Sequence, residues 1–127
     1  TIPPFLNSLT GITAGFGYWI KMYNAQTLEL SGVPTDSSFS INLRAGWNLI
    51  SYWGEDGKNP ADAFQDLIND VDEDGNMNLI AITGYDNGIL LYNPIMPPFL
   101  NTLTEMKNNA GYWIKVRHQV DNFTYPL

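Results

Sequence analysis

Alternating apolar and polar positions predict several of the strands. Residues 39–43 (FSINL) alternate, and residues 47–52 (WNLISY) follow them across a short Ala-Gly link. A period of two is typical of half-buried strands, so we predict two strands joined by a tight turn. Two further apolar runs, 78–83 and 89–92, flank an Asp-Asn-Gly sequence. Asn and Gly tolerate positive φ, so this pair is predicted to be a hairpin.

One segment has the spacing of a helix instead. Asn59 suits the N-cap and Pro60 suits the first helical position. The apolar residues that follow recur every three or four positions, which places them on one face of a short amphipathic helix. They are Ala61, Phe64, Leu67 and Ile68.

The chain contains an internal repeat. Residues 3–21 (PPFLNSLTGITAGFGYWIK) and 97–115 (PPFLNTLTEMKNNAGYWIK) are offset by 94, and twelve of the nineteen paired positions are identical. Near-identical apolar strings need near-identical environments, so both GYWIK segments are predicted to be strands in equivalent, pseudo-symmetric positions of one core. Residues 27–30 and 123–125 are predicted to pair back on them.

These elements together predict a mostly-β fold with about eight strands and one short helix, built as a β-sandwich or barrel-like domain. The period of 94 divides the 127 residues unequally. We expect a single domain over residues 1–127, in which 1–35 are the second half of a preceding repeat and 36–127 are one complete repeat unit. Because the chain begins inside the repeated motif, we expect a mature product or a piece of a longer protein.

The order of the motifs also resembles a known kind of module. Residues 46–51 (GWNLIS), a helix, the Tyr-x-Asn-Gly hairpin at 85–88, the Tyr-Asn-Pro at 92–94 and the GYWIK at 111–115 are similar to the tandem "GWNLIS…GYWIK" repeat modules of secreted and cell-surface proteins of bacteria and archaea. The chain departs from that pattern at Ile82 and Thr83, where the modules usually carry a Trp, and in an inserted acidic loop. The resemblance implies an extracellular or cell-surface location and modular use beside neighbouring modules, and it implies no reaction.

Charge and composition exclude several functions. The net charge is −7, with thirteen acidic and six basic residues. A chain of that charge lacks the basic footprint that phosphate backbones require, so we expect no nucleic-acid partner. No apolar run approaches the length of a membrane span, so we expect no membrane insertion. The chain has no cysteine and one histidine, which excludes disulfides, thiolate metal sites and sites that need two imidazoles.

An acidic loop carries the spacing of a calcium site. Residues 70–78 read DVDEDGNMN, and alternate oxygen-bearing side chains around a Gly can turn toward one hard cation. We predict calcium as a structural cofactor, held by Asp70, Asp72, Asp74, Asn76 and Asn78. Position twelve of the loop is Ala81 instead of the Glu of an EF-hand. The alternative is a solvated acidic turn in which Asp-Gly serves only as turn chemistry.

The aromatic residues suggest a second kind of site. Trp19, Trp47 and Trp113 are expected to be core anchors, because Trp is highly buried on average. Tyr52, Trp53 and Tyr85 flank turn-rich segments and are predicted to be exposed and to bind a polysaccharide or cell-surface glycan.

No set of residues predicts catalysis. The single histidine, His118, has no partner in sequence that would complete a triad, and Ser51 lacks an elbow motif. The sequence therefore predicts a non-catalytic extracellular module, stabilised by calcium, that supports adhesion or carbohydrate attachment. Two alternatives stay open: a carbohydrate-binding module of a polysaccharide-degrading system, and a self-assembling structural subunit of a surface layer or filament.

Overall fold

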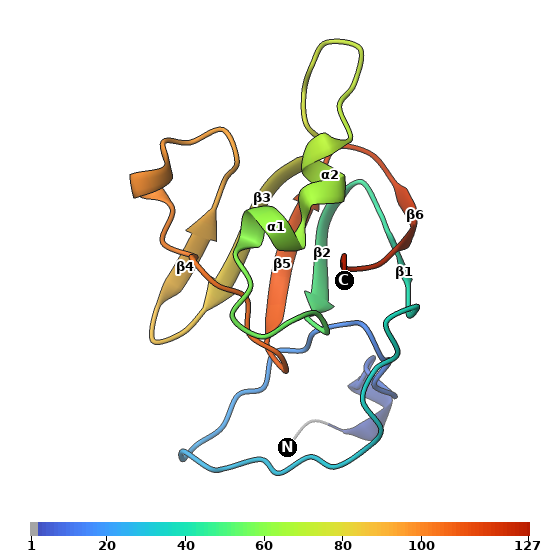
Figure 1. The fold of residues 1–127 in the computed structure, drawn as a ribbon. Coiled ribbons are helices and arrows are strands. Elements are labelled where there is room, and N and C mark those ends of the chain that lie inside the picture. The colour runs from blue at the N-terminus through green and yellow to red at the C-terminus, as the bar shows by residue number, and fades with distance from the viewer. Residues whose placement is uncertain (1–2) are drawn as a thin grey trace.

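Six strands form two antiparallel sheets in the computed structural model, which describes residues 3–127 (Figure 1). A four-stranded sheet has the order β2-β5-β3-β4, and a two-stranded sheet pairs β1 with β6. The mostly-β fold with a short helical segment is confirmed; within the described residues there are six strands in place of about eight, and the sheets do not close into a barrel. The strands are β1 (Ile41–Leu43), β2 (Gly46–Ser51), β3 (Leu79–Tyr85), β4 (Ile89–Tyr92), β5 (Gly111–Val116) and β6 (Val120–Phe123).

The two sheets are joined by a bent antiparallel ribbon. One arm of the ribbon is β1 followed by β2, and the other arm is β5 followed by β6. Ile41 pairs with Phe123 at one end, and Ser51 pairs with Gly111 at the other. The Asn48 side chain fixes the bend, because it accepts a hydrogen bond from Arg44 N and donates one to Arg44 O. Gly46 has φ +94° at this corner, a conformation that L side chains rarely adopt.

The ribbon corrects two of the predicted pairings. The expected tight turn between residues 39–43 and 47–52 is a corner between sheets, so β1 and β2 do not pair with each other. The C-terminal strand pairs with β1 and not with the GYWIK strand. The physical reason is that a Gly at positive φ serves a corner as well as a hairpin, so the local sequence does not distinguish the two.

The predicted β3–β4 hairpin is present. Its strands pair from Ile82 with Tyr92 to Tyr85 with Ile89, and Asn87 in the turn has φ +54°. The outer edge of β4 is covered by the chain that follows, because Thr102 N and Leu103 N both donate to Leu91 O.

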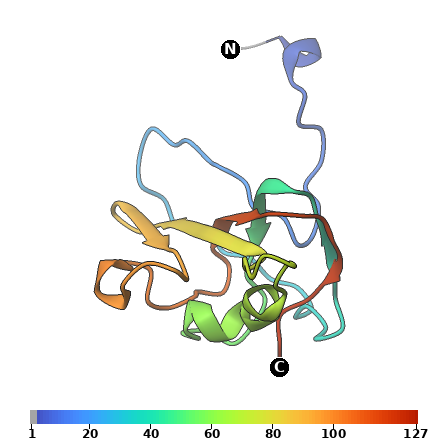
Figure 2. The ribbon, with the colours of Figure 1, turned by 90° about the horizontal axis from the view of Figure 1, so that it is seen from above.

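Two short helices cover one face of the four-stranded sheet (Figure 2). They are α1 (Pro60–Ala63), capped by the Asn59 side chain as predicted, and α2 (Gln65–Asn69). The predicted helix is thus broken at Phe64, whose ψ of +23° interrupts the helical path. Phe64 and Leu67 are buried against the inward residues of the strands, such as Ile82. Among the described residues, no helix is long and apolar enough to cross a membrane.

The two repeat copies share their local conformation. Each begins with a 3-10 turn, η1 (Pro4–Leu6) or η2 (Pro98–Leu100). In each, a tyrosine hydroxyl accepts a hydrogen bond of 2.8 Å from the backbone N–H five residues earlier: Tyr18 from Thr13, and Tyr112 from Lys107. Each also has a left-handed residue at the same repeat position, Gly15 with φ +88° and Asn109 with φ +64°.

Their surroundings nevertheless differ, which overturns the predicted pseudo-symmetry. The second GYWIK is β5, the central strand between β2 and β3, whereas residues 17–21 form no strand. The backbone of the first copy meets the sheet at the other edge of β2, through a bridge between Phe16 and Ile50, and its Trp19 ring packs against Tyr85 of β3. Residues 27–30, expected to pair back on it, are likewise exposed and form no strand. One β2 and one β3 are available among the described residues, and β5 occupies the position between them.

Three tyrosines fill the end of the core near the C-terminus. Tyr52 and Tyr125 meet edge to face with ring centroids 4.7 Å apart. The Tyr52 hydroxyl donates to Glu55 O and the Tyr125 hydroxyl donates to Ser51 O. Burial raises the pKa of Tyr52 to about 12, and it also raises the pKa of Tyr125 and Tyr112 above the usual value.

These tyrosines predict alkaline instability. A folded-state pKa above the unfolded value of about 10 means that the stability is fully present below pH 10 and is lost as the pH rises toward 12. We expect the urea midpoint to fall between pH 9.5 and 11.5, roughly the window in which unfolded tyrosine ionises. Tyr52→Phe should flatten this fall, at about 1 kcal/mol of stability for the lost hydrogen bond. A midpoint that does not change with pH would contradict the burial of these hydroxyls.

Candidate functional site

The outer face of the four-stranded sheet is apolar and open. Successive residues of a strand point to opposite faces, so Tyr112 and Ile114 point to the helices and Trp113 points outward. Trp113 lies beside Thr83 of β3 in the pairing register, and Trp47 lies one strand away on β2. Trp47, Thr83 and Trp113 line a shallow apolar depression of about 430 Å³. The two indoles therefore lie on neighbouring strands, and the hydroxyl-bearing Thr83 lies next to Trp113 on the far side from Trp47.

Further aromatic and charged groups extend this face. The Lys115 ammonium lies 5.5 Å from the centroid of the Trp47 ring, a cation–π distance. At the hairpin end, Tyr85 packs edge to face with Trp19, with centroids 6.1 Å apart. Trp47, Tyr85 and Trp19 are 49%, 62% and 67% exposed. We call the set formed by Trp47, Trp113, Thr83, Lys115 and Tyr85 the aromatic face.

The expectation that Trp19, Trp47 and Trp113 are core anchors is wrong. Tyr112 takes the buried position in β5, at 4% exposure, and its hydroxyl accepts from Lys107 N. Adjacent aromatic residues on a strand cannot both point inward. Strand alternation shows that only one of Tyr112 and Trp113 can point inward. Because tryptophan is generally buried, the sequence favours Trp113, whereas the buried residue is Tyr112.

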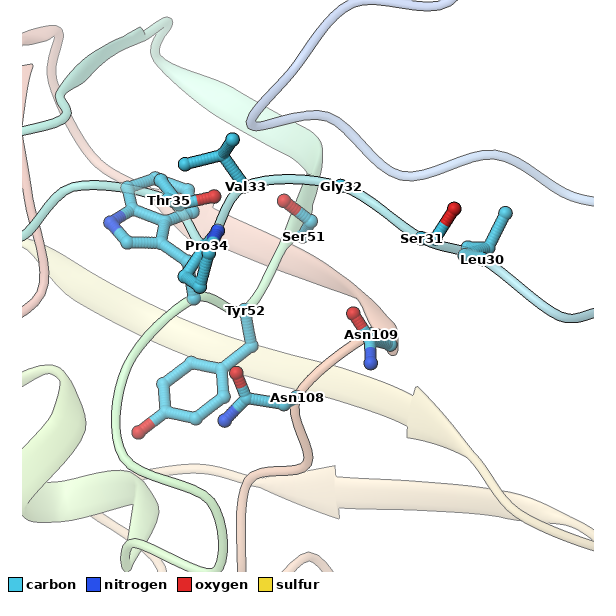
Figure 3. A pocket seen from close by; sticks show the side chains of 11 residues that line it. Leu30, Ser31, Gly32, Val33, Pro34, Thr35, Ser51, Tyr52, Asn108 and Asn109 are labelled. Atoms are coloured by element: carbon cyan, nitrogen blue, oxygen red, sulfur yellow. The ribbon is translucent and has the colours of Figure 1, made fainter.

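The three residues predicted to bind a ligand do not lie together. Tyr52 and Trp53 line a polar pocket of about 470 Å³ between the 30–35 segment and the Asn108-Asn109 turn (Figure 3). Tyr85 lies on the aromatic face instead. Tyr52 is 2% exposed, so its predicted exposure is wrong. The Asn108 side chain is already bonded to Gly54 O.

Trp53 is a packing residue. Its ring lies 4.9 Å from that of Phe39 and 4.7 Å from that of Tyr125, in edge-to-face contacts. Its Nε1 is buried, and no acceptor reaches it among residues 3–127. Trp53 thus packs Phe39, just before β1, and Tyr125 against the end of β2, and it is partly buried where exposure was predicted. The sequence around Trp53 does not predict these contacts, because Phe39 and Tyr125 are distant from Trp53 in sequence.

The acidic loop is closed by its own hydrogen bonds. Asp72 Oδ1 accepts from Asp74 N and from Asn76 N, and Gly75 at φ +81° completes the turn. The N–H of Asn76 is the main cause that lowers the pKa of Asp72, with the Asn76 side chain next. A lowered pKa means that this contribution is present above pH 4 and is lost as the pH falls below the usual carboxyl value. Figure 1 shows the loop projecting beyond α2.

Asn78 is a buried hub at the corner of the ribbon. It is 0% exposed, and its Oδ1 accepts from both Arg117 N and His118 N. Its Nδ2 donates to Asp70 Oδ2, which also contacts His118 Nε2 at 2.9 Å. Arg117 Nε donates to Met77 O, next to the hub. These bonds satisfy the backbone where β5 turns toward β6, so His118 and Asn78 have structural partners.

This geometry bears on the predicted calcium ligands. An amide oxygen has two lone pairs, and both lone pairs of Asn78 Oδ1 accept backbone N–H groups. Within the described part of the chain, no three acidic or histidine side chains converge on a common point. Asp72 Oδ1 is engaged by its own loop, whereas its Oδ2 accepts only from the Asn76 side chain, so a cation would bind after Asp70 and Asp74 turn toward Asp72. Calcium binding by Asp70, Asp72, Asp74, Asn76 and Asn78 stays a prediction.

Comparison with protein-family models, with curated proteins and with solved structures finds no match to this chain. The site is therefore interpreted from its own geometry. The aromatic face is preformed on strands, it offers flat rings and few charges, and it can bind a ligand that has both apolar faces and hydroxyl groups.

The packing predicts opposite behaviour for two predicted ligand residues. Trp53→Ala should lower the free energy of unfolding by roughly 2–4 kcal/mol, because it removes a half-buried ring that contacts two others. Tyr85→Ala should change it by less than about 1 kcal/mol, because Tyr85 is exposed on a hairpin. Urea unfolding of the two variants measures this difference. Equal losses would place Trp53 outside the core.

Calcium binding is tested by thermal melts in EDTA and in about 10 mM calcium. Binding to the folded state raises stability by roughly 2.7 kcal/mol at a hundred times the dissociation constant, which is a shift of several degrees. Because an ion bound by Asp72 would change the field at the N–H groups that donate to it, the backbone amide signals of Asp74 and Asn76 should also move in NMR spectra. Asp72→Asn should abolish both changes. Identical melts would leave the hydrogen-bonded acidic turn as the account of this loop.

Proposed function

We propose that the chain is a non-catalytic binding module of an extracellular or cell-surface protein, and that it holds a neutral polysaccharide on the aromatic face. The observation that carries the proposal is the pair of outward indoles, Trp47 and Trp113, on the neighbouring strands β2 and β5, with Thr83 beside Trp113 on β3. Sugar rings have apolar C–H faces that stack on flat aromatic side chains, and hydroxyl groups that need polar partners at the rim. The aromatic face supplies both.

The strands support binding because they hold the rings in place. Trp113 is on the central strand, paired with Leu49 on one side and with Thr83 on the other. A side chain held by packing loses little conformational entropy when a ligand arrives. Lys115 above the Trp47 ring and the hydroxyl of Thr83 are polar groups within this surface. The face therefore combines a rigid apolar floor with hydrogen-bonding groups.

Charge argues for a neutral ligand. The chain has a formal net charge of −7, which repels sulfated and uronic-acid polymers in solution. Lys115 is the one cation among the residues that we assign to the aromatic face. A neutral glycan avoids this repulsion while retaining the stacking contacts.

The extracellular location rests on the similarity to secreted and cell-surface repeat modules, with neighbouring modules of a parent protein as further partners. Calcium stabilisation of the acidic loop is a separate proposal, since the loop and the aromatic face share no residue. The function is proposed to be attachment without chemistry, because His118 is engaged in the corner contacts of Asn78 and Asp70.

Glycan binding predicts a distinct response to two substitutions. Trp47→Ala and Trp113→Ala should each weaken retention of a neutral polysaccharide at least about tenfold, the scale expected for losing a central aromatic contact. Trp47→Ala should change the free energy of unfolding by less than about 1 kcal/mol, because Trp47 is half-exposed. A glycan array of neutral and acidic glycans identifies the ligand, and affinity electrophoresis quantifies it.

Tyr23→Ala is the matched control, because it removes a fully exposed aromatic ring from outside the aromatic face. It should leave retention unchanged. Retention that survives both tryptophan substitutions, or an array with no neutral-glycan signal, contradicts the proposal. Repeating the array in EDTA separates glycan binding from any effect of calcium on the loop.

A further inference from the structure

The first repeat copy exposes the apolar side chains that the second copy buries. Ile20 is 69% exposed, whereas its counterpart Ile114 is fully buried. Leu9 is 63% exposed and Leu103 is 2% exposed. The same contrast holds for a third pair, in which Ile12 is 81% exposed and Met106 is buried. These exposed residues form an apolar surface on residues 3–22, which we call the first-copy surface.

The backbone that carries the first-copy surface has much of the conformation that the second copy has in the core. Both copies have the same 3-10 turn, the same hydroxyl-to-backbone hydrogen bond and the same left-handed position, although their surroundings differ. The local sequence therefore produces this conformation without a place between β2 and β3. The shared features extend as far as Tyr18, so the segment that would have to become a strand on docking is residues 17–21, the counterpart of the first part of β5.

The second copy shows what covers such a surface. β5 pairs with β2 on one side and with β3 on the other. The inward side chains of the second copy pack against a cluster that includes Ile50, Phe64 and Ile82. These three come from residues 36–94, the part of the repeat that precedes the Pro-Pro motif and that we call the front half.

We propose that residues 3–22 dock with a front half of this same repeat that lacks a back half of its own. A second copy of the present chain is a poor occupant, because its front half already holds its own β5. The edge of β2 in the same chain does not cover this surface either. Its backbone contacts with the first copy are the Phe16 bridge and two adjoining hydrogen bonds, Gly17 N to Leu49 O and Ser51 N to Gly15 O. An unpaired front half supplies the missing β2, helices and β3 together.

Extending the chain tests this docking. Residues 36–94 are added directly before Thr1, so that the repeat spacing of 94 is kept and the whole natural chain follows. We expect a second cooperative unfolding unit. Amide exchange at residues 18–21 should slow at least about a hundredfold relative to the unextended chain, as for strand amides in a folded core.

Two matched variants make the result specific. Ile20→Asp places a charge where Ile114 is buried in the second copy, and Thr10→Asp places one where Thr104 is exposed. In the extended chain, Ile20→Asp should abolish the exchange protection and the added unfolding unit, whereas Thr10→Asp should leave both unchanged. In the unextended chain, neither variant should change the unfolding transition or the amide exchange at residues 18–21.

Three outcomes would overturn the proposal. The added segment could stay unfolded or aggregate while residues 36–127 unfold as before. Exchange at residues 18–21 could remain as fast as in the unextended chain. Ile20→Asp could also prove no more disruptive than Thr10→Asp, which would show that any new structure does not use the first-copy surface.

Discussion

The pairing of one long segment with another, β1–β2 with β5–β6, is the constraint on which the rest of the structure depends. These arms are far apart in sequence, yet they pair in both sheets, from Ile41 with Phe123 in one to Ser51 with Gly111 in the other, with a corner between them. Two asparagines make the bend between the sheets possible, because Asn48 ties down Arg44 and Asn78 satisfies the turn after β5. The helices, the tyrosine cluster and the β3–β4 hairpin all pack against this bent ribbon.

The same ribbon separates a covered face from an open one. Tyr112 and Ile114 point toward Phe64 and the core, so the intervening Trp113 must point outward beside Trp47. The proposed glycan contact is thus a consequence of strand alternation in β5, and no mobile loop is required to form it. The ribbon also explains the asymmetry of the repeat: the second copy completes the sheet, whereas the backbone of the first copy bonds only to the outer edge of β2.

Local signals in the sequence predicted local structure well. The Asn59 cap, the Asn-Gly hairpin and the alternating strands follow from residues that are adjacent in the chain, and the structure contains them. Non-local choices were not predictable in the same way. The residues near Gly46 are compatible with a corner and with a hairpin. The residues near Trp53 do not predict that its ring packs against Phe39 and Tyr125, which are distant in sequence. The DxDxDG spacing likewise fits both an ion and a self-bonded turn, and Asn78 became a structural hub only through its contact with the end of β5.

The central claim is that one face of the sheet is buried beneath the helices and the other presents tryptophan to solvent. Hydroxyl-radical footprinting of the intact chain, read by mass spectrometry, measures this for all aromatic side chains in one experiment. The account predicts that Trp47 and Tyr85 are oxidised at rates close to that of the fully exposed Tyr23, and that Tyr52, Tyr112 and Tyr125 are strongly protected. Protection of Trp47 equal to that of Tyr112 would contradict it, because the outer face would then be covered.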